Sequence, residues 1–107
     1  MTTEYPNTIT GIKRFFKNIK VTAINTTSAT ALQAALAGQD ILLFPEHETG
    51  SATYYSSLAA TVQSFAGSGK IVIICGSGSY NSRIFDMGLF SGTYYGTTSS
   101  LSLTVTD

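Results

Sequence analysis

The sequence Ile41-Leu42-Leu43-Phe44 decides the fold class, because four consecutive apolar residues stand between polar neighbours and a proline. A run of this length is typical of a buried strand rather than of a helix. A strand that is apolar on both faces is characteristic of a parallel sheet covered on both sides. Residues 71–75, IVIIC, repeat the pattern. The two runs are therefore predicted to be central strands of a parallel sheet.

Helical segments are predicted before and between these strands. Residues 9–19 carry apolar side chains at intervals of three and four, the spacing of one helical face. Residues 29–37 are rich in good helix formers and follow Ser28, a favourable N-cap. Residues 81–87 are predicted to form a short helix. The apolar stripe of a further helix consists of Tyr55, Leu58, Val62 and Phe65.

Two more strands are predicted outside the central pair. Residues 20–24 alternate and contain β-branched side chains, and residues 101–105 place leucine and valine on one face and serine and threonine on the other. The second pattern is typical of a half-exposed edge strand. Alternating helices and strands predict an α/β fold, here a three-layer flavodoxin-like sandwich. Its small, mostly parallel sheet should have about four strands, in a single domain over residues 1–107.

Composition and charge exclude several classes of function. Six basic and six acidic side chains give a formal net charge of zero, and only 11% of the 107 residues are charged. Nucleic-acid binding needs clustered lysine and arginine, so no nucleic-acid partner is expected. Apolar runs of four or five residues are far shorter than the ~18 that a membrane span needs, so no membrane insertion is expected.

The cysteine content and the polar surface indicate the surroundings of the chain. Cys75 is the single cysteine, which excludes an internal disulfide and a cysteine-based zinc cluster. No cofactor is expected. A surface rich in serine and threonine and poor in charge favours an extracellular location, as part of a secreted protein. The first ten residues are polar and do not predict a signal peptide.

Two predicted loops follow the carboxyl ends of the central strands, where α/β sheets bind their ligands. They cover residues 45–50 and 76–83. Their candidate ligand-binding residues are Glu46, His47, Glu48, Ser77, Ser79, Asn81 and Arg83. On an extended chain the two glutamates of the first loop converge while the histidine between them points away. The hydroxyl and amide groups of the second loop are weak zinc ligands, so no metal site is expected.

Ser77 is the candidate nucleophile if the chain is an enzyme. It lies between two glycines on a predicted strand-to-helix turn, as an exposed nucleophile does. His47 would be its base, and Glu46 or Glu48 would orient the imidazole. The same glycines also suit a phosphate cradle, or simply a sharp turn. Cys75 ends an apolar strand and is expected to be buried and unreactive.

Two stretches carry a resemblance to a known family. ALAGQDILLFPE at residues 35–46 resembles the second half of a strand–helix–strand unit in class I glutamine amidotransferase-like domains. GSGKIVIICGSG at residues 67–78 resembles the helix end, strand and turn that follow it there. The similarity is closest to the non-catalytic, trehalose-utilisation-like branch, which occurs within larger secreted bacterial proteins. The resemblance implies a flavodoxin-like scaffold without the ammonia-releasing chemistry.

Departures from the family pattern bear on both chemistry and fold. Catalytic members have a cysteine in a G-x-C-x-G turn and a later His-x-Glu pair, whereas Cys75 follows Ile74 here and no histidine follows His47. The family fold also has a central first strand, but only a short polar segment precedes Pro6. The chain is therefore expected to be minimal or truncated at that strand, or to have a rearranged sheet.

These observations predict a non-catalytic structural or binding module. It would be a domain of a larger extracellular protein or a self-assembling subunit. Self-association is expected through a sheet edge or through residues 93–106, because a missing strand leaves backbone groups unpaired and the net charge offers no repulsion. The alternative is a small hydrolase or ligand-binding enzyme domain that uses the loops at residues 45–50 and 76–83.

Overall fold

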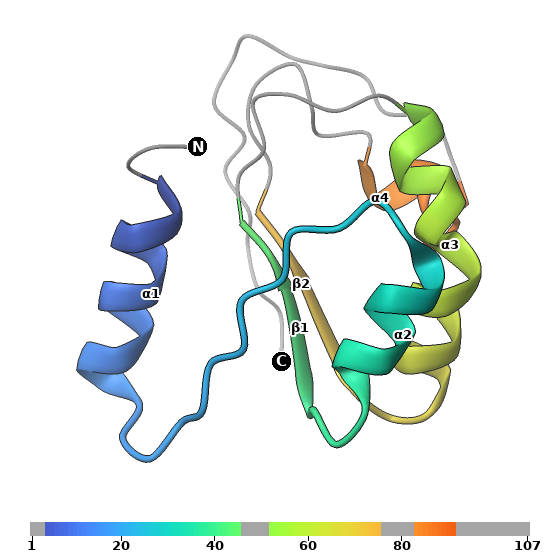
Figure 1. Cartoon of the computed structure of the whole chain (residues 1–107). Helices are drawn as coiled ribbons and strands as arrows, with labels where there is room; N and C mark the ends of the chain where they lie inside the picture. The colour runs from blue at the N-terminus through green and yellow to red at the C-terminus, as the bar shows by residue number, and fades with distance from the viewer. Residues whose placement is uncertain (1–3, 46–51, 76–82, 92–107) are drawn as a thin grey trace, which may run out of the picture.

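The computed structural model describes residues 4–45, 52–75 and 83–91 and has a mixed α/β fold (Figure 1). These ranges contain four helices and a small parallel sheet. In chain order the elements are α1 (Glu4–Phe15), α2 (Ala29–Leu36), β1 (Ile41–Phe44), α3 (Ala52–Gly67), β2 (Ile71–Ile74) and α4 (Arg83–Asp86).

The two predicted central strands pair with each other in parallel. Ile41 lies opposite Ile71, and the register continues to the ends of both strands. The N–H of Ile71 donates to the carbonyl of Asp40 at 3.1 Å, and the N–H of Cys75 donates to the carbonyl of Phe44 at 2.9 Å. The prediction of a small parallel sheet is confirmed. Within the described residues the sheet contains β1 and β2 alone.

The prediction of a strand at residues 20–24 is wrong. These residues belong to the connection between α1 and α2, and none of them pairs with β1 or β2. A β-branched, alternating sequence becomes a strand only where a neighbouring strand accepts its hydrogen bonds, and this segment has none among the described residues. The predicted strand at residues 101–105 lies outside the described residues.

A residue with a left-handed backbone conformation follows each of the helices α1 and α2. Ser28 is the N-cap of α2, as predicted, and its hydroxyl accepts a hydrogen bond from the N–H of Ala31 at 3.3 Å. Gly38, with φ 73°, follows the end of α2. α1 begins earlier than predicted and ends at Phe15, and Asn18, three residues later, has φ 61°.

The core lies between the sheet and the helices α2, α3 and α4. All four residues of the predicted α3 stripe are buried, and Val62 is fully so. The core consists of Leu32, Leu42, Phe44, Tyr55, Leu58, Val62, Phe65 and Met87. Burial of large apolar side chains, at roughly 25 cal/mol per Å², is the main force that holds α3 on the sheet.

A tight turn after α4 brings Met87 into this core. Gly88 has φ 63°, and the N–H of Leu89 donates to the carbonyl of Ile84 at 3.1 Å. The side-chain amide of Gln63, on α3, donates to the carbonyl of Met87 at 2.9 Å. A Cβ at position 88 would meet that amide nitrogen at 2.5 Å. The positive φ favours glycine at this position, and the Gln63 amide would have to shift to admit a larger residue.

The two faces of the sheet differ in their surroundings, contrary to the prediction that both are covered. The covered face carries Leu42, Phe44, Val72 and Ile74, which pack on the helices. The opposite face, here called the open face, consists of Ile41, Leu43, Ile71 and Ile73. The three isoleucines are 52%, 55% and 43% exposed. α1 stands on the side of the sheet away from α2 and α3 (Figure 1), but it does not bury these side chains.

A long-range hydrogen bond holds the connection between α1 and α2 to α3. The hydroxyl of Tyr54 donates to the carbonyl of Thr26 at 3.1 Å. The ring of Tyr54 also stacks edge-on against Tyr55, with the ring centroids 4.9 Å apart. Burial raises the pKa of the Tyr54 phenol above its ordinary value of 10.0. The contact therefore depends on a phenol that keeps its proton in the folded chain.

We expect the folded chain to lose stability as the pH rises above 10, in part through Tyr54. Above that pH the phenol ionises in the unfolded chain while the folded chain still holds the proton, so rising pH favours unfolding. Below pH 10 both states are protonated and the contribution is complete. Tyr54→Phe should weaken this alkaline loss and cost about 0.5–1.5 kcal/mol at pH 7 for the missing hydrogen bond. Urea unfolding at several pH values measures both effects; an unchanged pH dependence in Tyr54→Phe would contradict the assignment.

Candidate functional site

The two loops predicted to bind ligands lie outside the described residues except for Pro45 and Arg83. These loops contain Glu46, His47, Glu48, Ser77, Ser79 and Asn81. Arg83 is the first residue of α4, and only its backbone is described. The pairing of Ser77 with His47, and with it the alternative of an enzyme, stays a prediction. Both loops follow strands that the structure does describe, at the carboxyl end of the sheet.

The described part of the chain contains no cluster of metal-ligating side chains. In residues 4–45, 52–75 and 83–91, no group of three histidine, cysteine, aspartate or glutamate side chains is placed to hold a metal ion. The ion pair between Lys70 and Asp40, 2.7 Å between Nζ and Oδ1, lies where the two strands begin. The Asp40 side chain is largely exposed, so this pair contributes little to stability.

Cys75 follows β2 and is half-buried rather than fully buried, which corrects the sequence-based prediction. The prediction failed because side chains alternate along the strand, so position 75 falls on the side of Ile71 and Ile73 and not on the covered face. The backbone N–H of Cys75 is held by the carbonyl of Phe44. We expect a thiol reagent to label Cys75 more slowly in the folded chain than in denaturant. Equal labelling rates with and without guanidinium would show that the fold does not shield the thiol.

The most distinctive feature of the described surface is its apolar character. The open face carries three exposed isoleucines, and no charged residue occurs within β1 or β2. The end of α1 and the connection to α2 add further exposed apolar side chains, which are Phe15, Phe16, Ile19, Val21 and Ile24. Clustered exposed apolar side chains on a small domain mark surfaces that another element covers.

Each strand has one unpaired edge among the described residues, and the hydrogen-bond register shows which backbone groups lie there. In a parallel ladder alternate residues bond to the same neighbour. Because Ile71 and Cys75 bond toward β1, the N–H and C=O groups of Val72 and Ile74 point to the outer edge of β2. By the same alternation, the backbone groups of Ile41 and Leu43 point to the outer edge of β1.

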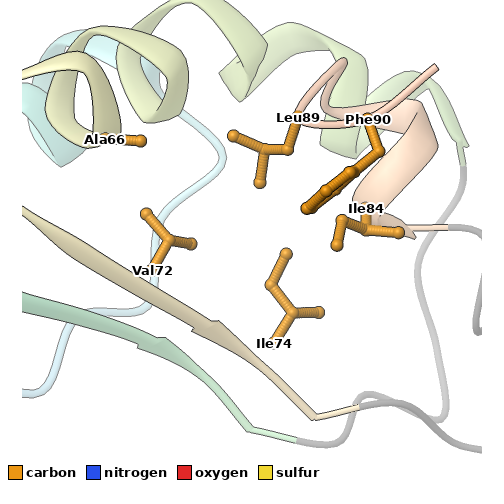
Figure 2. A pocket seen from close by; sticks show the side chains of 6 residues that line it. All are labelled: Ala66, Val72, Ile74, Ile84, Leu89 and Phe90. Carbon is orange, nitrogen blue, oxygen red and sulfur yellow. The ribbon is translucent and has the colours of Figure 1, made fainter. Parts of the chain in front are cut away.

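A cavity of about 300 Å³ lies over β2, between the covered face and α4 (Figure 2). Figure 2 shows Val72 and Ile74 pointing from β2 toward Ile84, Leu89 and Phe90. Ala66 of α3 completes the wall, so every lining residue is apolar except for its backbone. Phe90 is 64% exposed at this cavity. The site was not predicted from the sequence, because it depends on how the consecutive elements α3, β2 and α4 pack in space.

Comparison of the chain with protein-family models, with curated proteins and with solved structures found no match. The resemblance to glutamine amidotransferase-like domains therefore stays a prediction. Within the described residues, no helix is long and apolar enough to cross a membrane.

Proposed function

We propose that this chain is a non-catalytic structural module that self-associates through the outer edge of β1 and the adjoining open face. The observation that carries the proposal is a coincidence of two features in the same residues. The backbone groups of Ile41 and Leu43 point away from β2, and their side chains belong to the open face. An added strand would thus gain hydrogen bonds and apolar contacts together.

The charge distribution supports association between identical chains. The formal net charge is zero, so two copies do not repel each other. Edge strands that avoid pairing usually carry lysine, proline or a bulge, whereas β1 is ILLF. Asp40 precedes the strand and is already paired with Lys70. Within its four residues β1 therefore carries neither lysine nor proline, and Pro45 follows directly after it.

The finer fold and context of the module belong to the same proposal. A flavodoxin-like sheet of about four strands, of the glutamine amidotransferase-like type, would have a strand beside β1 that the described residues do not supply. A strand contributed by another chain would fill that place. A position within a larger extracellular protein is consistent with the low charge of the sequence.

Residue-resolved amide exchange tests which edge is used. The N–H groups of Ile41 and Leu43 should exchange faster when the protein is diluted, because dilution separates the chains and returns these groups to water. The N–H groups of Leu42 and Phe44 point toward β2 and serve as the internal control, with exchange independent of concentration. Exchange at Ile41 and Leu43 that does not change on dilution would contradict association through this edge.

A further inference from the structure

We infer that the outer edge of β2 and the apolar cavity beside it form the docking site for residues 101–105 of the same chain. The site combines the free backbone groups of Val72 and Ile74 with the cavity that their side chains line. This inference concerns the opposite edge of the sheet from the proposed self-association and does not rest on it.

The positions of α3 and α4 indicate at which edge of the sheet the next strand is expected. α3 connects β1 to β2 across the covered face, and α4 lies on the same face, where Met87 and Leu89 pack with the core. Crossovers between parallel strands are almost always right-handed. Two successive crossovers of the same hand over the same face step in the same direction. A strand that follows α4 is therefore directed past β2, away from β1.

The lining of the cavity suits aliphatic side chains. The cavity has a volume of about 300 Å³ and is partly open to the surface. Its walls offer no side-chain polar group to hold water, since all six lining residues are apolar (Figure 2). A strand at the β2 edge would continue the covered face over this space and bury the exposed ring of Phe90.

Residues 101–105 fit this site by their sequence. Leu101, Leu103 and Val105 alternate with Ser102 and Thr104, so a strand would present three aliphatic side chains to the cavity and hydroxyls to the other face. The segment can also reach the site. Ser91 adjoins the cavity residue Phe90, and the ten residues from there to position 101 span up to about 33 Å when extended. Running back along the length of a strand such as β2 takes only about 13 Å of this reach.

The test is residue-resolved amide exchange of the full chain, compared with two lysine variants of equal charge. In the unmodified chain the N–H groups of Val72 and Ile74 should be protected, independently of protein concentration. Leu103→Lys places a charge toward the cavity and should lower that protection at least about tenfold. Thr104→Lys places the same charge on the opposite face and should leave it unchanged. Leu103→Ser gives a milder variant if the lysine prevents folding, with Val62 on α3 as the reference for an intact core.

Four results would overturn the inference. Fast exchange of Val72 and Ile74 in the unmodified chain would mean that the edge is free. Equal protection in Leu103→Lys would mean that another segment covers it. Protection that falls on dilution would assign the site to a second copy, and loss of protection at Ile41 instead would place the segment beside β1. The proposed self-association is judged separately, by the concentration dependence at Ile41 and Leu43.

Discussion

Replacing Leu58 with alanine should lower the free energy of unfolding by about 2–5 kcal/mol, the range for truncating a buried leucine. Leu58 lies on the α3 face that packs on the sheet and is 1% exposed. Its removal takes away transfer free energy and leaves a cavity that the neighbouring core residues fill only in part. A chain of this size has a total stability of roughly 5–15 kcal/mol, so the variant should be near the limit of folding. Urea unfolding followed by circular dichroism measures the change.

Ile71→Ala is the matched control, because it truncates an aliphatic side chain of similar size on the open face. At a protein concentration too low for association, it should cost less than about 1.5 kcal/mol, since more than half of Ile71 is already in contact with water. If both variants were equally destabilised, the open face would be buried within the single chain. The distinction between a covered and an open face would then be wrong.

Ile73→Lys should weaken self-association at least about a hundredfold in dissociation constant. The side chain of Ile73 lies on the open face beside that of Leu43 and is partly exposed, so the single chain can hold a lysine there with its ammonium in water. In an assembly that covers the open face, the same ammonium would be buried without a partner, which costs several kcal/mol. Sedimentation velocity over a series of concentrations measures the shift.

Ser56→Lys separates this effect from the added charge. Ser56 is exposed on α3, on the far side of the helices from the open face, and its replacement adds the same single charge. Its association should match that of the unmodified chain. Equal weakening by both lysines would assign the effect to net charge, and no weakening by Ile73→Lys would place the interface elsewhere.

Local sequence patterns predicted the elements whose formation depends on local interactions. The strand at residues 41–44 has the predicted bounds, and Ser28 caps α2 as expected from its hydroxyl. The stripe of Tyr55, Leu58, Val62 and Phe65 is buried throughout. In each case the deciding interaction is within a few residues in sequence, or follows from the period of the helix or strand.

Non-local pairing limited the rest of the prediction. Residues 20–24 have the composition of a strand, but a strand needs a neighbour, and no neighbour for them is present in the described ranges. The open face was expected to be covered because its residues are apolar. The pattern of apolar residues in a strand does not show which element lies against that face. The cavity over β2 depends on how α3, β2 and the turn after α4 meet in space. This cavity has no signature in any single segment.

The mass of the unmodified chain as a function of concentration tests the proposed self-association most directly. Light scattering coupled to gel filtration, from low micromolar to near-millimolar protein, gives the weight-average mass. We expect a rise from the monomer value of 11.3 kDa to at least twice that value. A mass that stays at 11.3 kDa over the whole range would contradict self-association through the sheet.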